Sequence, residues 1–168
     1  AVGARLIYSS GDIQHAGLML GLGGTCGHLW RNYSSEAAAC NPHVVYPGRR
    51  MAVTAACLAV RRAAFDLVGG LDEVNYPVTL NDVDFCLRLG REGLRNVYRG
   101  DAVLLHDESQ SRGSDDEQRR KRERRRAETR TFRQMWGEIL DDDPYGSPAF
   151  DRSTESGAVY IPAQQLAG

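Results

Sequence analysis

The stretch that decides the fold of this chain lies between Gly69 and Arg91. It begins as Gly69-Gly70-Leu71-Asp72-Glu73, passes through a short loop, and continues as Asn81-Asp82-Val83-Asp84-Phe85-Cys86-Leu87-Arg88-Leu89-Gly90-Arg91. Paired glycines readily take the positive φ needed just past a helix end, so the first part predicts a helix terminus and a turn. The second part predicts a helix that Asn81 caps, with Asp84 at the capping-box position. On this interpretation both aspartates, Asp82 and Asp84, are structural.

The length and charge of the chain favour one soluble domain. The sequence has 168 residues, a length that buries about 70% of the unfolded-state surface. The net charge is −1, from 21 basic and 22 acidic residues, which predicts no nucleic-acid partner. Nine of the basic residues lie between Arg119 and Arg133, where Glu123 and Glu128 are the only acids. No apolar run has transmembrane length and no secretory signal is visible, so we expect a cytoplasmic protein, with contact to a membrane surface left open.

Four cysteines are spread along a chain that is long enough to need no disulfides. Cys57 and Cys86 lie in apolar runs and are expected in the core. The other two stand near histidines, at a spacing that is not that of a standard zinc site. We favour ordinary loop residues over zinc ligands for this set, which consists of Cys26, His28, Cys40 and His43.

The chain before Gly69 predicts strands and one short helix. Residues 2–8 and the apolar residues from Ile13 indicate a hairpin around a Ser-Ser-Gly-Asp turn. The glycine-rich segment 21–27 lacks the context of a phosphate-binding loop and indicates a connector. Residues 51–60 form a continuous apolar run, which is typical of a buried central strand. Residues 61–68 predict a helix that ends at the paired glycines.

The chain after Arg91 predicts two short strands, a long helix and a tail. The strands are expected over 95–98 and 102–106, and the second ends at His106. A capping box that starts at Ser114 predicts a helix over about 115–140. An apolar stripe in its second half favours docking on the core, whereas the arginine-rich half favours solvent. Residues 146–168 form a polar C-terminal tail.

Four segments carry a resemblance to a known family. They are the stretch 69–91, Val53-Thr54-Ala55-Ala56-Cys57, His106-Asp107-Glu108-Ser109-Gln110-Ser111-Arg112-Gly113, and the ending from Trp136 to Asp143-Pro144-Tyr145. Together they resemble the acceptor-side half of family 2 glycosyltransferases, which have the GT-A fold. The resemblance implies an α/β fold over residues 1–145: a partial GT-A domain with a mixed β-sheet and flanking helices, lacking the N-terminal nucleotide-binding half. Asp107 departs from the family, which has a second histidine there.

The resemblance also implies an activity and residues for it. It implies inverting transfer of a sugar from a nucleotide-sugar donor to a saccharide or other hydroxyl acceptor, as in polysaccharide biosynthesis. Asp82 corresponds to the general base. His106 corresponds to a ligand of the divalent metal, Mg²⁺ or Mn²⁺, and Arg112 is a candidate contact of the donor diphosphate. The pocket for the acceptor and donor sugar would be lined by Thr54, Ala55, Asp72, Glu73 and Asn81.

The same resemblance limits what the chain can do alone. Asp82-Val83-Asp84 has the letters of the family's Asp-x-Asp metal motif but opens a helix, so we do not assign the metal there. We therefore expect the isolated chain to be inactive, with an uncovered sheet face that can pair with a second copy. Two other functions stay open. One is a non-catalytic module that binds an anionic partner through the basic helix 119–133, and the other is a metal-dependent hydrolase using Asp82, His106 and Asp107.

Overall fold

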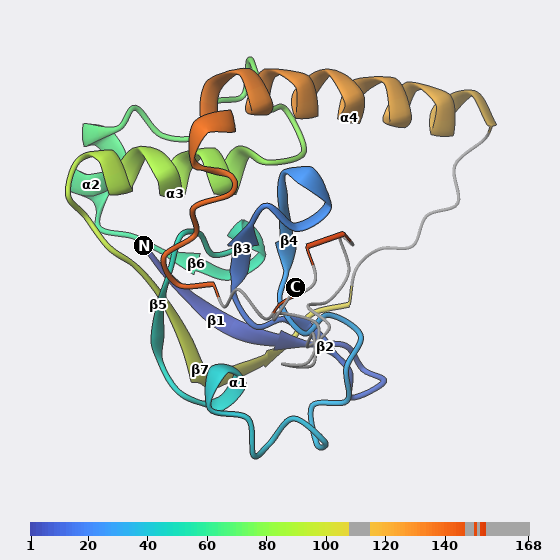
Figure 1. Cartoon of the computed structure of the whole chain (residues 1–168), viewed down its shortest axis with the longest axis vertical. Coiled ribbons are helices and arrows are strands. Elements are labelled where there is room, and N and C mark those ends of the chain that lie inside the picture. The colour runs from blue at the N-terminus through green and yellow to red at the C-terminus, as the bar shows by residue number, and fades with distance from the viewer. Residues whose placement is uncertain (108–114, 147–149, 151, 154–168) are drawn as a thin grey trace, which may run out of the picture.

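In a computed structural model of the chain, residues 1–107, 115–146, 150, 152 and 153 are described. The protein is α/β, with a curled mixed β-sheet and helices α2, α3 and α4 on one side of it (Figure 1). The strands are β1 (Val2–Ile7), β2 (Ile13–His15), β3 (Leu18–Leu20), β4 (Cys26–His28), β5 (Gly48–Arg50), β6 (Leu58–Ala59) and β7 (Asn96–Leu105). The α-helices are α1 (Pro42–Val45), α2 (Arg62–Leu67), α3 (Asn81–Arg91) and α4 (Asp115–Trp136), and the 3₁₀ turns are η1 (Leu22–Gly24), η2 (Ala55–Cys57) and η3 (Gly137–Ile139).

The centre of the sheet is a parallel pair formed by β1 and β7, two strands from opposite parts of the chain. Their register runs from Val2 beside Val97 to Ile7 beside Leu105. The other edge of β1 is shared by β2 and β6, both antiparallel, and β5 pairs antiparallel with the start of β7. The hairpin predicted at the N-terminus is therefore confirmed. Strands β3 and β4 form a separate two-stranded sheet.

The prediction of a continuous buried strand over 51–60 is wrong. The extended backbone stops at Thr54, whose hydroxyl accepts a hydrogen bond from the N–H of Ala56 and so starts the turn η2. Ala55 and Ala56 are exposed, and only two residues beyond the turn pair with β1. Alanine is a weak strand former and a threonine hydroxyl competes for backbone donors, so this apolar run turns where a run of valines would continue.

The prediction of two strands over 95–98 and 102–106 is also corrected, because one strand, β7, covers both. Its register with β1 slips between the partners of Ala4 and Arg5, which are Arg99 and Val103. The residues between them form a bulge. At Gly100 a Cβ would lie 2.3 Å from the carbonyl oxygen of Val44, so helix α1 packs against backbone there. Gly100 lies in the gap between the two predicted strands, and in the sheet it allows a bulge.

Of the two helix boundaries around the stretch 69–91, one agrees with prediction and the other does not. Helix α2 ends at Leu67, and the glycines that follow it, Gly69 and Gly70, have φ angles of 75° and 73°, so the predicted terminus and turn are confirmed. Helix α3 begins at Asn81 without a side-chain cap, and the capping position belongs to Leu80 in the left-handed conformation, with φ 66°. The predictions of Asn81 as the cap and of Asp84 as a capping-box acid are therefore wrong.

Helix α4 lies across α3 on the side away from the sheet, and its N-terminal part extends beyond the rest of the molecule (Figure 1). The C-terminal part joins the core through Phe132 and Trp136, whereas Met135 of the predicted apolar stripe is 45% exposed. None of the helices described is long and apolar enough to cross a membrane. The tail 146–168 lies almost wholly outside the described residues.

Candidate functional site

The start of α3 meets the turn η2, and this contact joins three of the predicted site residues. The N–H of Ala55 donates to Oδ2 of Asp82 at 3.0 Å, and the N–H of Val83 donates to Oδ1 at 2.9 Å. Thr54 stands next to this contact as the buried cap of the turn. The Asp82 side chain is half-buried and Ala55 is exposed, so the carboxylate lies at the protein surface between two chain segments.

The second aspartate of the pair has a different environment. Asp84 is 1% exposed, and its two oxygens accept hydrogen bonds from Nε of Arg88 at 2.8 Å and from Nε1 of Trp136 at 3.0 Å. Arg88 also donates to the carbonyl oxygens of Val68 and Gly70. This network links α3 to the glycine turn and to α4, so Asp84 holds the fold together rather than capping a helix.

Glu128 is a residue whose role the sequence did not reveal. It lies among the arginines of α4 but is 2% exposed, and its carboxylate accepts the N–H groups of Val78 and Thr79 at 3.2 Å each, together with the hydroxyl of Thr79. These residues precede Leu80, whose left-handed backbone starts α3. A signal was available, because Glu128, Phe132 and Trp136 recur every four residues and therefore share one helix face. Glu128 thus positions the loop that leads to Asp82.

Replacing Glu128 by glutamine should destabilise the fold by about 1–3 kcal/mol, because an amide has one acceptor oxygen where the carboxylate has two. The loss should be local, so hydrogen exchange at the amides of Val78 and Thr79 should speed up, while urea unfolding gives the change in stability. The matched control is Glu123→Gln, on the exposed surface of the same helix. Equal effects of the two substitutions would contradict the role assigned to Glu128.

The remaining residues of the predicted pocket lie in the loop between α2 and α3 and at the start of α3. Asp72 accepts hydrogen bonds from the N–H groups of Val74 and Asn75 and from Nδ2 of Asn75. These bonds lower the pKa of Asp72, and the bond from the Asn75 backbone has the largest effect. Its oxygens therefore serve the turn. Glu73 is exposed, and Asn81 is half-buried beside Asp82. Arg112 lies outside the described residues.

His106 follows the C-terminal end of β7, where its N–H donates to the carbonyl oxygen of Ile7. Its ring Nδ1 is buried and has no hydrogen-bond partner among the described residues, which leaves one nitrogen available to a ligand. The neighbouring Asp107 accepts the N–H of Ser9 at 2.9 Å and lines a polar hollow of 410 Å³ together with Asp12 and Arg31. Asp82 makes its hydrogen bonds elsewhere, so the described residues show no direct bond between it and His106.

No group of three His, Cys, Asp or Glu side chains that could hold a metal is formed within residues 1–107 and 115–146. His106 and Asp107 thus supply a partial donor set, which does not fit a complete metal centre. The four residues considered for zinc are also not assembled: Cys40 is exposed and faces the carbonyl oxygen of Ala37, and His43 lies on α1. Burial raises the pKa of Cys26, and the negative charges of Asp82 and Asp143 raise it further. Cys26 therefore stays a neutral thiol.

A further hollow lies along the C-terminal half of α3, and Asp82 does not line it. It measures 310 Å³ and is lined by residues from α3, β7 and α4, including Cys86, Leu87, Gly90, Asn96 and Trp136. None of the predicted site residues lines it. Burial raises the pKa of the Cys86 thiol to about 12, so the cysteine in this hollow is a neutral packing residue.

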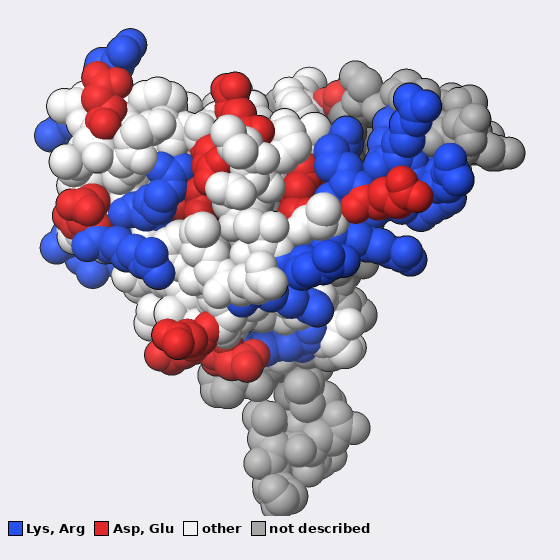
Figure 2. Space-filling model, turned by 90° about the horizontal axis from the view of Figure 1, so that it is seen from above, with Lys and Arg blue, Asp and Glu red and all other residues white. Residues whose placement is uncertain are grey.

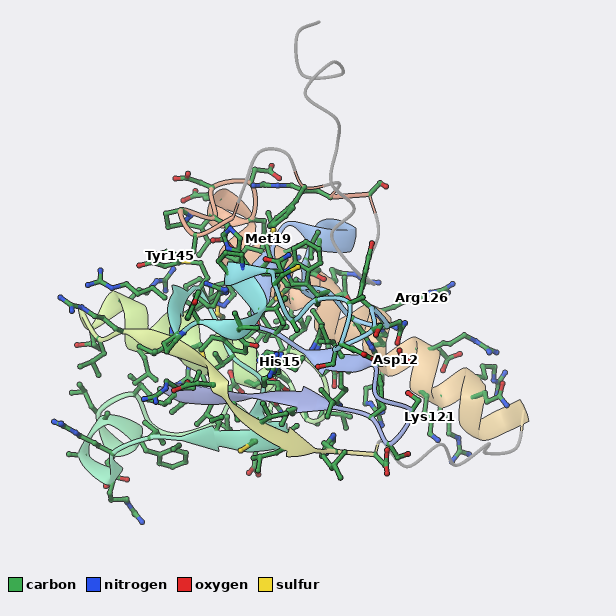
Figure 3. The ribbon with its side chains drawn as sticks, turned by 90° about the horizontal axis from the view of Figure 1, so that it is seen from below. Asp12, His15, Met19, Lys121, Arg126 and Tyr145 are labelled. Atoms are coloured by element: carbon green, nitrogen blue, oxygen red, sulfur yellow. The ribbon has the colours of Figure 1, made fainter. Side chains whose placement is uncertain are left out.

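Two histidines from different strands form a close pair, His15 of β2 and His28 of β4. His15 (Figure 3) has no exposed surface, and its Nδ1 is 3.1 Å from Nδ1 of His28. The Tyr98 ring also makes an edge contact with the His15 ring. Burial, followed by the charges of His28 and Arg50, lowers the pKa of His15 well below 6.5. His15 is therefore neutral in the folded protein, while the unfolded chain takes up a proton near pH 6.5.

The stability of the protein should consequently fall as the pH drops below about 6.5, by up to about 1.4 kcal/mol per pH unit for His15 alone. The sign follows from proton uptake: below that pH the unfolded chain binds more protons than the folded one, so protonation favours unfolding. Urea unfolding at a series of pH values measures this slope, and His15→Asn should flatten it. The exposed His43 gives the control, His43→Asn, and a slope unchanged in His15→Asn would contradict the assignment.

Comparison with curated proteins places the chain among longer relatives. It is 42% identical over 147 residues to the uncharacterized protein y4gI of Sinorhizobium fredii, which is 88% of this chain and 16% of the relative. It is 38% identical over 116 residues to the O-antigen biosynthesis protein RfbC of Myxococcus xanthus, 68% of this chain and 9% of the relative. It is 44% identical over 63 residues to the N-acetylglucosaminyl-diphospho-decaprenol L-rhamnosyltransferase of Mycobacterium tuberculosis, 38% of this chain and 20% of the relative.

The chain thus spans a fifth or less of the length of each of these relatives. Two of the three have names from sugar transfer and polysaccharide assembly. No protein-family model matches the chain, and no solved structure gives a significant match.

Proposed function

We propose that this chain is the acceptor-side part of a family 2 glycosyltransferase and that Asp82 is its general base. The class of reaction is supported by similarity to a rhamnosyltransferase and to an O-antigen biosynthesis protein. The name of the rhamnosyltransferase describes an acceptor sugar joined through diphosphate to a long-chain lipid alcohol. We extend this chemistry to the present chain, with a nucleotide-linked sugar as donor and a sugar on a diphospho-lipid as acceptor.

The observation that carries the role of Asp82 is its contact with the N–H of Ala55. Three aspartates lie in α3 or in the loop that precedes it, and their partners distinguish them. Asp84 is buried and bonded to Arg88 and Trp136, and Asp72 is occupied by its own turn. Asp82 accepts one N–H on each oxygen and is half-exposed, so each oxygen keeps a lone pair that an acceptor hydroxyl can use.

In the proposed step, Asp82 takes the proton of the acceptor hydroxyl as that oxygen bonds to the anomeric carbon of the donor. The bond from the anomeric carbon to the diphosphate oxygen breaks, and the diphosphate leaves with the electron pair. Attack opposite to the leaving group inverts the configuration of the sugar. A base in this position contributes a factor of about 10²–10⁴ to the rate. The small side chains at Thr54 and Ala55 leave room for the sugars beside the base.

The family's divalent metal would neutralise the departing diphosphate. Within the described residues, His106 offers one nitrogen and Asp107 is bonded to Ser9, so the chain alone does not complete a metal site. We expect the remaining ligands and the nucleotide-binding surface to come from other parts of the longer polypeptide that the relatives represent, and we expect the isolated 168 residues to be inactive.

The test is a transfer assay with the natural polypeptide that contains this segment. Labelled sugars on nucleotide donors are offered with N-acetylglucosamine on a diphospho-lipid, and the lipid fraction is analysed for label. We expect one donor to give a labelled lipid product and the isolated segment to give none. If no donor is turned over and calorimetry detects no binding of nucleotide sugars to the natural polypeptide, the proposed function is wrong.

A further inference from the structure

The outer face of α4 carries a row of arginines that the proposed reaction does not use. Their positions recur at intervals of three and four residues, so helix geometry places them within one sector of about 80°. All of them are exposed. We name this set the arginine row, and it consists of Arg119, Arg122, Arg126, Arg130 and Arg133. Over its length of about 21 Å it forms a nearly straight line of positive charge.

Most of the arginine row lies away from the part of α4 that packs on the protein, whereas Arg133 at its C-terminal end donates from Nε to the carbonyl oxygen of Gly24 at 2.9 Å. Glu128, Phe132 and Trp136 form the buried face of the helix, where Glu128 is bonded to Val78 and Thr79 and is not available to neutralise the row. Glu123 is the only exposed acid between residues 119 and 133. Like charges at these spacings repel each other along a helix, so the row costs stability unless an anionic partner offsets the repulsion.

The shape of this region is suited to a flat partner. The N-terminal part of α4 extends beyond the body of the protein (Figure 1), and basic side chains gather around it in the view from above (Figure 2). Arg126 and Lys121 stand at opposite edges of this projecting helix (Figure 3). Arg126, Arg130 and Arg133 also line a shallow open hollow together with Thr129 and Gln134. A projecting helix of this kind can lie along a surface without obstruction from the sheet (Figure 1).

We propose that the arginine row docks the protein on a membrane surface rich in anionic phospholipids. Guanidinium groups pair with phosphate in bidentate fashion, and each basic residue near such a surface strengthens binding about fivefold. A nucleic acid fits less well, because the aromatic residues of this part of α4, Phe132 and Trp136, are buried and cannot stack on bases. The choice of a membrane rests on the proposed function, since a diphospho-lipid acceptor is held at a bilayer.

The experiment is co-sedimentation of the 168-residue chain with vesicles of phosphatidylcholine, with or without phosphatidylglycerol. The chain should bind the anionic vesicles and not the neutral ones, and binding should weaken with salt. The triple variant Arg122→Gln, Arg126→Gln, Arg130→Gln should bind about a hundredfold more weakly, because three basic contacts are lost. Glutamine is a good helix former, so circular dichroism should show an unchanged helix content.

The matched control removes the same charge from exposed arginines elsewhere, as Arg49→Gln, Arg61→Gln, Arg62→Gln. The proposal is overturned if the wild-type chain ignores anionic vesicles, if the control loses as much binding as the α4 variant, or if a nucleic-acid oligonucleotide is bound in preference to the vesicles. The assay contains no sugar nucleotide, so its outcome is independent of the transfer assay. Binding without transfer would refute the proposed function alone.

Discussion

The substitution Asp84→Ala should lower the free energy of unfolding by about 3–5 kcal/mol, the cost of removing one partner of a buried ion pair. Asp84 is 1% exposed, and its loss leaves Nε of Arg88 and Nε1 of Trp136 without their acceptor. Arg88 would remain tied to the carbonyl oxygens of Val68 and Gly70, so its charge cannot simply turn to solvent. Urea unfolding measures the loss directly, and α4 should loosen first because Trp136 is its anchor.

The chain contains a matched control for this prediction. Arg62 and Asp66 form the same type of ion pair, at the same distance of 2.8 Å and the same spacing of four residues, but their side chains are 87% and 53% exposed. Asp66→Ala should therefore change stability by less than about 1 kcal/mol, as is usual for exposed pairs. If Asp84→Ala and Asp66→Ala have the same small effect on stability, the buried bonds of Asp84 to Arg88 and Trp136 do not stabilise the fold.

The substitution Asp82→Asn should reduce sugar transfer by the natural polypeptide by about 10²–10⁴-fold, because an amide cannot accept the acceptor proton. The fold should be almost unaffected. The amide oxygen keeps one of the two backbone hydrogen bonds, so the expected loss of stability is about 1 kcal/mol or less. Turnover and the unfolding midpoint are therefore measured on the same preparation.

Two outcomes separate a base from a structural anchor. If Asp82→Asn abolishes transfer with an unchanged unfolding midpoint, the carboxylate acts in the chemistry. If transfer and stability fall together, the bond to Ala55 is the main role of Asp82 and the assignment of the base is wrong. Asp66→Asn, on the exposed surface of α2, is the control for the loss of one negative charge. It should leave both quantities unchanged.

The predictions that failed at the candidate site failed for a common reason. Asn81 and Asp84 have the residue types and spacing of a helix cap and a capping box, and local pattern favours that interpretation. In the folded protein, Glu128 of α4 accepts hydrogen bonds from the backbone just before α3. Trp136 and Arg88 donate hydrogen bonds to the carboxylate of Asp84. Contacts between segments far apart in sequence thus replaced local hydrogen bonds that the pattern alone would predict.

The apolar run at 51–60 illustrates the same limit for a strand. Its hydrophobicity was visible in the sequence, but the turn at Thr54 depends on a side-chain hydrogen bond to Ala56, and on the bond from Ala55 to Asp82. These two bonds place Ala55 beside Asp82, the candidate base. In a continuous strand, Ala55 would not lie next to Asp82. The strand prediction therefore failed at Ala55, the residue whose N–H contacts the candidate base Asp82.

The sequence alone determined the elements that depend on neighbours in the chain: the N-terminal hairpin, the glycine turn after α2, and the helix α3. Turn chemistry, positive φ at glycine and helical periodicity act over a few residues, so they can be seen in the residues themselves. Only the tertiary structure decided what each acid does. Asp82, Asp84 and Glu128 carry the same charged group, and their roles differ because burial and the donors that reach them come from distant segments.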